Sequence, residues 1–304
     1  MLTADFIRRL IMMMAGSLYI IATPIGNLED ITLRALRVLG EVDLIACEDT
    51  RHTRKLLAHY QISRPTISYH QHNERERTPQ LIDRLKSGLS LALVSDAGTP
   101  LVSDPGHRLV QEAIAQGIQV VPLPGASALV AALAAAGLAT DEFYFAGFLP
   151  SKPSSRRARL AALAGVKATL VFYEAPHRIK ETLADARQAL GNRQCVVARE
   201  LTKLHEQFIR GALDEVHARM SQTEVRGEIV LLVGPQVADA AESVNQAGSR
   251  SIAEAVAALI DDEGLDQKAA LKRVARARRL SKSEAYRRLI AERAAEETAA
   301  DDVE

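Results

Sequence analysis

The stretch that decides the fold is Leu91-Ala-Leu-Val-Ser-Asp-Ala-Gly-Thr-Pro-Leu-Val-Ser-Asp-Pro-Gly106, a short apolar run followed by a long loop. The run lacks polar alternation, which is typical of a strand buried on both faces. The loop from Ser95 onward contains two Gly, two Pro and two Asp residues. After a buried strand, such a loop places peptide groups and carboxylates at the carboxyl edge of the sheet, where open α/β folds bind ligands. The stretch therefore predicts a parallel sheet with a binding site at this edge.

On both sides of this stretch, short apolar runs alternate with segments of helical periodicity. In the first half of the chain we expect strands at Leu18–Thr23, Leu44–Cys47, Leu91–Ser95 and Val120–Leu123, and helices at 30–40, 50–59, 76–87 and 105–116. In the second half we expect strands at Phe143–Gly147, Thr169–Tyr173, Cys195–Ala198 and Ile229–Val233, and helices at 155–164, 176–189 and 212–220. This alternation predicts an α/β protein with mostly parallel sheets covered on both faces.

The chain of 304 residues exceeds the length at which one core usually stops growing, so we expect more than one domain. Pro122-Leu-Pro-Gly-Ala-Ser127 interrupts the chain and then opens an Ala/Leu-rich helix. The predicted organisation is an extension at 1–16, α/β domains at 17–123 and 124–235, a linker at 236–249, a three-helix unit at 250–296 and an acidic tail at 297–304.

The three-helix unit, with helices near 251–262, 266–278 and 282–295, has two interpretations. Ser281 and Glu284 fit a capping box that opens its last helix. Its basic residues gather in the region from the second helix to the third, at Lys272, Arg273, Arg276, Arg278, Arg279, Lys282, Arg287 and Arg288. The unit could be a helix-turn-helix that docks on nucleic acid, or a helical cap whose charges are simply solvated.

Composition excludes several classes of protein. There are 38 Lys and Arg against 38 Asp and Glu, so a nucleic-acid partner would have to be held by local patches. The absence of Trp disfavours a stacking platform for single strands. Cys47 and Cys195 stand without a CxxC or zinc spacing, so we expect two buried, reduced thiols and no metal. The apolar run near the N-terminus is shorter than the roughly 20 residues that span a bilayer, so we expect a cytoplasmic protein without a membrane segment.

Three further junctions carry the residues of ligand-binding turns. Thr23-Pro-Ile-Gly-Asn-Leu-Glu-Asp30 follows the first strand; Gly26 permits a tight turn, and Asp30 or Thr32 can cap the next helix. It is not GxGxxG, which disfavours a dinucleotide site. Pro124-Gly-Ala-Ser127 permits close backbone approach, although Ser127 could simply cap a helix. Arg199-Glu-Leu-Thr-Lys203 clusters charges at a strand end, where a functional site and a salt-bridged corner remain alternatives.

The order of these motifs resembles that of the RsmI family, the RNA-directed branch of the tetrapyrrole methylase superfamily. The motifs are Thr23-Pro-Ile-Gly-Asn-Leu28, Glu48-Asp-Thr-Arg51, Ser95-Asp-Ala-Gly-Thr-Pro100, Ser103-Asp-Pro-Gly106, Pro124-Gly-Ala-Ser127, Gly147-Phe-Leu-Pro150, Tyr173-Glu-Ala-Pro-His-Arg178 and Arg199-Glu-Leu-Thr-Lys203. The resemblance covers about residues 17–235, and the three-helix unit is similar to an appendage of some members. Leu101 departs from the family pattern, in which a smaller residue is expected.

The resemblance implies a bilobal, tetrapyrrole-methylase-like α/β fold that forms a homodimer, with S-adenosylmethionine in the cleft between the lobes. It also implies a reaction, the 2′-O-methylation of cytidine 1402 in 16S ribosomal RNA of the small ribosomal subunit. By similarity, the cofactor-binding positions are Ile25, Asp96, Ala97, Gly98, Thr99, Gly125, Ser127, Ala128, Tyr173 and Leu201.

Catalysis on a ribose 2′-hydroxyl is helped by a nearby base, because the protonated hydroxyl is a poor nucleophile. Glu48 and Asp49 follow the strand Leu44–Cys47 and so project from the same sheet edge as the long loop. Our hypothesis is that Glu48 or Asp49 is the base, with Lys203 or Arg199 as an electrostatic helper. The alternative is that the acidic pair only orders Arg51 and His52 through salt bridges.

Three local patches are candidates for RNA contact. The first contains Arg51, His52, Arg54 and Lys55; the second is Tyr69-His-Gln-His-Asn-Glu-Arg75, with His70 and His72; the third contains Lys152, Arg156, Arg157 and Arg159. The histidine pair lacks a third ligand, which disfavours a metal and leaves phosphate contact or a solvated loop.

Two other functions are compatible with the sequence. One is a methylase of a corrinoid or porphyrin precursor, which needs only a compact cleft and gives the basic clusters no role. The other is a nucleic-acid-binding regulator with the α/β part as a scaffold, which leaves the loop motifs idle.

Overall fold

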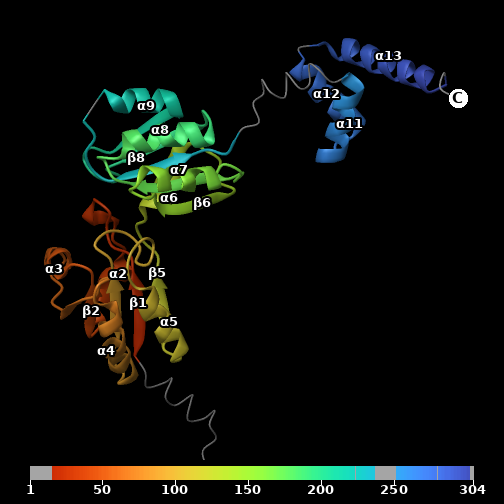
Figure 1. Cartoon of the computed structure of the whole chain (residues 1–304). Helices are drawn as coiled ribbons and strands as arrows, with labels where there is room; N and C mark the ends of the chain where they lie inside the picture. Colours follow the sequence, from red (N-terminus) through yellow and green to blue (C-terminus); the bar gives the residue numbers. More distant parts are fainter. Residues whose placement is uncertain (1–15, 223, 237–250, 279, 302–304) are drawn as a thin grey trace, which may run out of the picture. The chain divides into compact units, whose positions relative to one another are not determined.

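The computed structural model describes residues 16–222, 224–236, 251–278 and 280–301. The chain forms two compact units, and the boundary between them follows Pro235 (Figure 1). Residues 1–15, 237–250 and 302–304, which hold most of the predicted extension and linker and part of the predicted tail, lie outside the described residues. No helix in the described ranges has the length and apolarity that crossing a membrane requires.

The first sheet is parallel throughout, as predicted, with the strand order β3-β2-β4-β1-β5. Its strands are β1 (Ser17–Ile21), β2 (Leu44–Cys47), β3 (Thr66–Ser68), β4 (Leu91–Val94) and β5 (Gln119–Leu123). The connecting helices are η1 (Leu28–Asp30), α2 (Leu33–Glu41), α3 (Thr50–His59), α4 (Glu74–Lys86) and α5 (His107–Ala115). Thr32 caps α2, since its side chain accepts a hydrogen bond from the N–H of Ala35.

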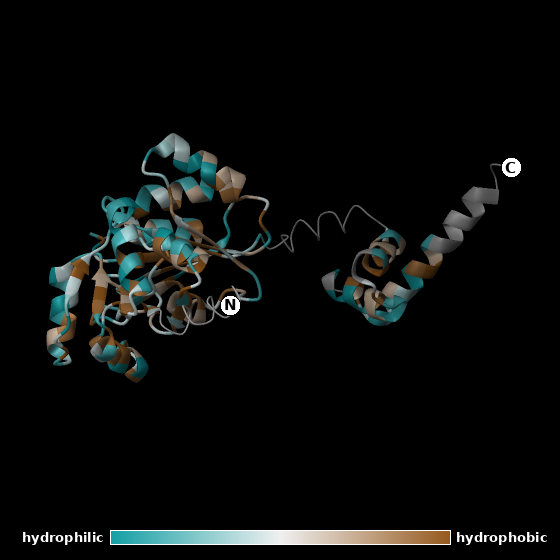
Figure 2. Cartoon of the chain, turned by 90° about the horizontal axis from the view of Figure 1, so that it is seen from below, coloured by the Kyte–Doolittle hydropathy of each residue, from teal (hydrophilic) through white to brown (hydrophobic). Residues whose placement is uncertain are grey.

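Helices cover both faces of the first sheet because alternate strand residues point to opposite sides. Leu18, Leu93 and their neighbours pack under α4 and α5. Ile21, Ile45 and Val94 pack under α2 and α3 on the other face. The helices carry hydrophobic residues on one side and hydrophilic residues on the other (Figure 2). We call this part of the chain, residues 17–123, the first lobe.

The second sheet differs from the prediction, because most of its strand pairs are antiparallel. Its order is β6-β7-β10-β8-β9, and only the β6–β7 pair is parallel. The strands are β6 (Phe143–Phe148), β7 (Thr169–Glu174), β8 (Gln194–Arg199), β9 (Gln207–Ala212) and β10 (Ile229–Val233). The strand β9 was not expected, and it pairs antiparallel with β8 through a short connection.

The helices of the second sheet are divided unequally between its faces. They are α6 (Ala128–Ala136), α7 (Pro153–Ala162), α8 (Ile179–Leu190) and α9 (Leu213–Ser221). Three of them, α7, α8 and α9, bury one face. The other face packs against α6 and against Ile25 of the first lobe. We call residues 124–235 the second lobe.

The C-terminal unit is a three-helix cluster with its own core. It contains α11 (Ile252–Glu263), α12 (Gln267–Ala277) and α13 (Lys282–Asp301). Val256, Val274 and Leu289 are among the residues buried between the helices. Half of the predicted capping box is present at the start of α13, where the Ser281 hydroxyl accepts a hydrogen bond from the N–H of Glu284 at 3.2 Å. The Glu284 carboxylate accepts a hydrogen bond from the Arg288 guanidinium at 3.1 Å.

The two cysteines are buried and unpaired, as predicted. Cys47 ends β2 in the first sheet, and Cys195 lies in β8 of the second. Burial raises the pKa of the Cys47 thiol, and it raises the pKa of Cys195 to about 12. Both thiols are therefore protonated and unreactive while the sheets are folded.

Candidate active site

Two loops meet at the carboxyl edge of the first sheet, because β1 and β4 are adjacent parallel strands. The N–H of Thr23 donates to the carbonyl of Gly98 at 2.9 Å, and the N–H of Gly98 donates back to the carbonyl of Thr23 at 3.0 Å. The Thr23 hydroxyl also donates to the carbonyl of Ser95 at 3.1 Å. The first turn and the long loop are thus joined into one wall.

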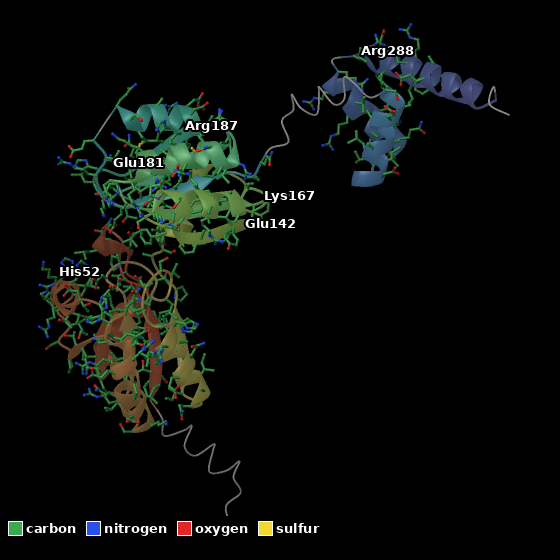
Figure 3. The ribbon with its side chains drawn as sticks, in the orientation of Figure 1. His52, Glu142, Lys167, Glu181, Arg187 and Arg288 are labelled. Atoms are coloured by element: carbon green, nitrogen blue, oxygen red, sulfur yellow. The ribbon has the colours of Figure 1, made fainter. Side chains whose placement is uncertain are left out.

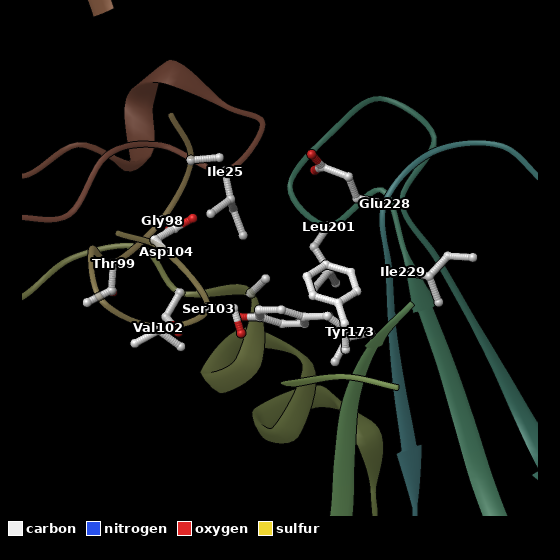
Figure 4. Close-up of a pocket in the computed structure, with 15 residues that line it drawn as sticks. Ile25, Gly98, Thr99, Val102, Ser103, Asp104, Tyr173, Leu201, Glu228 and Ile229 are labelled. Carbon is white, nitrogen blue, oxygen red and sulfur yellow. The ribbon is translucent and has the colours of Figure 1, made fainter. Parts of the chain in front are cut away.

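A cavity lies between this wall and the second lobe (Figure 4). It encloses about 730 Å³, counted out to its open mouth. The lining residues are Ile25, Ala97, Gly98, Thr99, Val102, Ser103, Asp104, Ser127, Ala128, Phe148, Tyr173, Leu201, Glu228, Ile229 and Val230. Eight of the ten positions predicted to bind a cofactor are in this lining, and Asp96 and Gly125 are the exceptions. We call it the first cavity.

The chemistry of this lining favours a cationic ligand. Two carboxylates, Asp104 and Glu228, contribute to it, and none of its residues is Lys, Arg or His. The rings of Phe148 and Tyr173 lie edge to face with centroids 5.6 Å apart, and aromatic rings attract cations. The side chain of Ser127, at the start of α6, makes no capping hydrogen bond, so its hydroxyl is available to a ligand. No basic side chain lines the cavity itself, which disfavours a pyrophosphate as its ligand.

The loops on the two sides of the first cavity contain unusual backbone. Leu101 and Ser103 in the long loop have φ values of 72° and 65°, and Glu200 and Thr202 in the facing loop have 51° and 64°. Each such residue costs about 1–2 kcal/mol when it is not glycine. The departure from the family pattern at Leu101 is accommodated because its side chain packs against the core of the first lobe.

The first turn touches the second lobe at Gly26. A Cβ atom on Gly26 would lie 2.4 Å from Cγ of Lys203 and 2.9 Å from the carbonyl oxygen of Leu201, so only glycine fits. The Lys203 ammonium donates to Glu200 at 2.8 Å and to Glu228 at 3.0 Å. Its charge is thus bound by two carboxylates of the second lobe, and its predicted catalytic role stays a prediction.

Gly125 is also required by a close approach. A Cβ atom there would lie 2.8 Å from Cβ of Ala22, so the turn before α6 packs directly on the end of β1. The Thr99 hydroxyl donates to the carbonyl of Ala126 at 3.1 Å and ties the same turn to the long loop. Gly125 therefore shapes the first cavity without lining it.

The two acidic residues after β2 differ in their surroundings. Asp49 caps the start of α3 and accepts hydrogen bonds from the N–H and the guanidinium of Arg51, both at 2.8 Å. These bonds hold the pKa of Asp49 well below its usual range, which makes it a poor base. For Glu48, burial and then the negative charge of Asp96 raise the pKa. Of the two predicted bases, the structure therefore favours Glu48.

Asp104 is a third acidic residue, which the sequence prediction did not include. Its carboxyl lines the first cavity. Burial, followed by the negative charge of Glu48, raises the pKa of Asp104 to about 6. The motif Ser103-Asp-Pro-Gly106 contained the signal, since this aspartate lies in the same ligand-binding loop as Asp96.

Asp96 lines a second cavity. Its Oδ1 accepts a hydrogen bond from the N–H of Asp49 at 3.0 Å. This second cavity encloses about 440 Å³ to its mouth and is lined by Thr23, Pro24, Leu28, His52, Lys55, Leu56 and Asp96. The cofactor-binding role predicted for Asp96 stays a prediction, and the structure shows that Asp96 lines this neighbouring cavity.

The predicted RNA patches are only partly on the surface. Arg51, His52, Arg54 and Lys55 are exposed on α3, and His72 is exposed in the loop before α4 (Figure 3 labels His52). The interpretation of Arg156 needs correction. It is only 4% exposed, and its Nε donates to Asp185 on α8 at 2.6 Å, so it joins α7 to α8 within the second lobe. Arg157 on the next position remains exposed.

Several other lining residues were missed, and those at β10 have no local pattern that marks them. Glu228 directly precedes β10, and Ile229 and Val230 are its first residues; β10 itself has the pattern of an ordinary buried strand. Phe148 ends β6, is exposed and lines the first cavity, and it lies in the motif Gly147-Phe-Leu-Pro150. Among the described residues, no cluster of three or more His, Cys, Asp or Glu side chains could hold a metal ion.

Comparison with known proteins identifies the family. Residues 17–217 match the family of tetrapyrrole (corrin/porphyrin) methylases. A protein of Pseudomonas aeruginosa called ribosomal RNA small subunit methyltransferase I is 52% identical over 236 residues, which are 76% of this chain and 84% of that protein. The protein of the same name from Synechocystis is 46% identical over 89% of this chain and 96% of its own length.

A solved structure shares the fold. The uroporphyrin-III C-methyl transferase of Thermus thermophilus complexed with S-adenyl homocysteine has a TM-score of 0.52 and 22% identity, over 72% of this chain and 97% of that one. At this identity the likeness shows the fold alone. The chain therefore belongs to the tetrapyrrole methylase family and, within it, to the group named ribosomal RNA small subunit methyltransferase I.

Proposed function

We propose that this chain transfers a methyl group from S-adenosylmethionine to the ribose 2′-oxygen of cytidine 1402 in 16S ribosomal RNA. The observation that carries the proposal is the lining of the first cavity, with two carboxylates, two aromatic rings and no basic residue, in a chain that belongs to this family. The cofactor has a positive sulfonium, a positive amino group and one carboxylate, so its net charge is positive and the acidic lining complements it.

The first cavity offers specific contacts to such a cofactor. Asp104 and Glu228 would accept hydrogen bonds from its amino and hydroxyl groups, and Tyr173 and Phe148 would pack against its cationic or aromatic part. The residues Ile25, Leu201 and Val230 supply apolar walls. When bound, the cofactor supplies an activated methyl group, so the protein has chiefly to position the ribose oxygen and keep water out.

Glu48 is proposed as the group that accepts the proton of the 2′-hydroxyl. Its raised pKa makes its carboxylate a stronger base than an ordinary glutamate, and Asp49 is committed to Arg51. The Lys203 ammonium faces Glu200 and Glu228, so its proposed contribution is to hold the facing loop and the charge balance of the cavity mouth.

The exposed basic residues of α3 are proposed to bind the RNA backbone, together with His72 and Arg157. The helices α12 and α13 are proposed to add a helix-turn-helix contact, because Lys272, Arg276 and Lys282 are exposed there. Removing the residues after Pro235 should then weaken RNA binding and leave cofactor binding unchanged. Ribosomal RNA as the substrate is also what supports a cytoplasmic location.

A homodimer is proposed on the basis of α6. Its sequence, Ala128-Leu-Val-Ala-Ala-Leu-Ala-Ala-Ala136, is apolar all around, and such helices are normally covered on every side. Val130 is nevertheless 59% exposed, and Phe143 of the edge strand β6 is 47% exposed. A second copy packed here would cover them. Light scattering should give twice the chain mass, and Val130→Glu should give the single mass.

One experiment tests the reaction. The protein is incubated with radiolabelled S-adenosylmethionine and either small ribosomal subunits that lack the modification or uroporphyrinogen. We expect label in the RNA, and mass spectrometry of the digested RNA should find it as 2′-O-methylcytidine at position 1402. Label in uroporphyrinogen would favour the tetrapyrrole alternative, and label at another nucleotide would contradict the assigned position.

A further inference from the structure

The proposed cofactor site and the proposed base Glu48 leave the second cavity without a role in the reaction. It lies beside the first cavity, and the two share a wall. Thr23 and Pro24 face the second cavity while Ile25 faces the first, and Asp96 faces the second while Ala97 faces the first. The paired hydrogen bonds between Thr23 and Gly98 hold this wall in place. A ligand in the second cavity is therefore close to one in the first.

Its lining combines three kinds of chemistry. Pro24, Leu28 and Leu56 form apolar walls. His52 and Lys55, one turn apart on α3, contribute a hydrogen-bonding ring and a cation. Asp96 contributes a carboxylate, and since Oδ1 accepts the N–H of Asp49, Oδ2 can accept from a ligand.

We propose that the second cavity holds the base of the target cytidine, turned out of the RNA stack. The inference rests on the proposed function and names the substrate group that the cavity receives. The apolar walls would sandwich the ring, as in other enzymes that act on extruded nucleotides. The ribose would then lie at the shared wall, near Glu48 and the first cavity.

Asp96 makes the cavity selective for cytosine. Cytosine presents an amino group at its position 4, which donates to a carboxylate, whereas uracil presents a carbonyl oxygen there. A carboxylate would repel that oxygen. The positive charge of Lys55 and the ring of His52 stand at the same cavity, where the flanking phosphate of a bound nucleotide would be attracted.

The test measures RNA binding rather than turnover. Two single-stranded RNAs of the region around position 1402 are used, identical except for C or U at the target, with 2-aminopurine next to it as a fluorescent reporter of unstacking. Binding is measured with S-adenosylhomocysteine present, for the full-length wild-type protein, Asp96→Asn and Lys55→Ala. Asp83→Asn and Lys86→Ala are the matched controls.

The controls lie on α4, at the opposite edge of the sheet. The N–H of Gly16, just before β1, donates to the carbonyl of Leu85 at 2.8 Å, so the end of α4 is at the amino edge of the strands. Asp83 and Lys86 are both exposed there. They match the charge changes without touching either cavity.

We expect the wild-type protein to bind the C-containing RNA about 10-fold or more tightly than the U-containing RNA, with a rise in fluorescence. Asp96→Asn should reduce this preference about 5-fold or more, because an amide can donate to uracil and still accept the Asp49 N–H. Lys55→Ala should weaken both RNAs about equally, roughly 5-fold, and lower the salt dependence by about one ion.

Equal binding of the two RNAs by the wild-type protein overturns the proposal, and so does an Asp96→Asn variant that behaves like Asp83→Asn. A Lys55→Ala variant that behaves like Lys86→Ala overturns the phosphate contact. Methyl transfer to small subunits is measured in parallel, so failure of the proposed function is seen separately from loss of C preference. Calorimetry of S-adenosylmethionine binding should change less than about 3-fold in Asp96→Asn, whereas a role of Asp96 in cofactor binding predicts a larger loss.

Discussion

Two carboxylates at the ends of strands, one in each lobe, show how similar motifs can differ in purpose. Glu48 follows β2 and Glu174 ends β7, and each precedes a helix. The Glu174 side chain is fully buried and accepts hydrogen bonds from the Ala175 N–H at 2.8 Å, the Thr182 hydroxyl at 2.7 Å and the Arg178 guanidinium. In the described part of the chain, the Glu48 carboxylate has no hydrogen bond or ion pair.

The difference in hydrogen bonding between Glu174 and Glu48 indicates a structural role for the first and a chemical role for the second. A buried carboxylate whose oxygens are all bound stabilises the lobe that contains it and has nothing left for a substrate. A half-buried carboxylate with a raised pKa and acidic neighbours is strained as an anion and ready to accept a proton. The first lobe therefore supplies the chemistry, and the corresponding position of the second lobe supplies rigidity.

The largest expected effect concerns Glu48. Glu48→Gln should lower kcat for methyl transfer about 100- to 1,000-fold, because the variant cannot accept the proton of the 2′-hydroxyl. Asp49→Asn is the control, since asparagine caps a helix as well as aspartate does, and it should stay within about 10-fold of wild type. Calorimetry should find cofactor affinity unchanged in both. Near-normal turnover of Glu48→Gln would break the comparison.

Glu174→Gln should have the opposite profile. Loss of the charge leaves Arg178 without its buried partner, so the free energy of unfolding should fall by about 2–3 kcal/mol. The folded fraction should keep kcat within about 3-fold of wild type. Urea unfolding and active-site titration measure the two quantities, and an enzyme that is stable but inactive would assign Glu174 to the chemistry instead.

The next prediction concerns Asp104, another half-buried carboxylate of the first lobe with a raised pKa. Its pKa in the folded protein is about 6, above its ordinary value of 3.8, so the folded state holds the proton more tightly than the unfolded chain. This stabilises the fold fully below about pH 4 and is lost as the pH rises through about 6. Asp104→Asn removes the burial of a charge, so it should be more stable than wild type by about 1–2 kcal/mol at pH 8 and equal to it near pH 4.

Urea unfolding of both proteins at pH 4 and pH 8 checks this prediction. Only the difference in the free energy of unfolding between the variant and the wild type is compared. A constant difference across the range would mean that Asp104 is an ordinary, solvated carboxylate. Because the carboxylate form suits a cationic ligand, wild-type affinity for S-adenosylmethionine should also fall below pH 6, and that of Asp104→Asn should not depend on pH in this range.

The smallest effect distinguishes two neighbouring arginines. Arg157→Gln should weaken RNA binding about 3-fold and reduce its salt dependence, and it should lower stability only slightly, because the Arg157 guanidinium, about half exposed, lies 3.5 Å from Asp185. Arg156→Met should leave RNA binding of the folded protein intact but lower its melting temperature, because Asp185 loses its buried partner. If Arg156→Met weakens RNA binding and leaves the melting temperature unchanged, then Arg156 contacts RNA and its ion pair with Asp185 does not stabilise the lobe.

The first lobe could be predicted from its sequence because its strands are continuous apolar runs and its turns contain glycine at fixed places. Four of the five strands of the second lobe were also predicted, but their pairing was not, because antiparallel pairing depends on which distant segments meet, and that information is absent from local periodicity. The strand β9, Gln207-Phe-Ile-Arg-Gly-Ala212, is a polar edge strand that pairs on one side only. Similarly, β3 has three residues and no pattern of its own.

In the candidate site, too, local features could be predicted and contacts between distant segments could not. The loops after β1 and β4 are local features, and their residues meet as expected, because the carboxyl ends of adjacent parallel strands converge. Arg156 was misread because the spacing of basic residues on α7 does not reveal the aspartate of α8 that faces it. The difference between Glu48 and Asp49 depends on one guanidinium, and only the three-dimensional arrangement shows which of the two carboxylates Arg51 binds.

The two cysteines can report on local unfolding of the sheets that contain them. Each sheet contains one buried thiol, Cys47 in the first and Cys195 in the second. A thiol-specific reagent can reach either one only when the strands around it separate. The order in which the two become labelled in native buffer would therefore show which lobe opens first, with no engineered reporter in either.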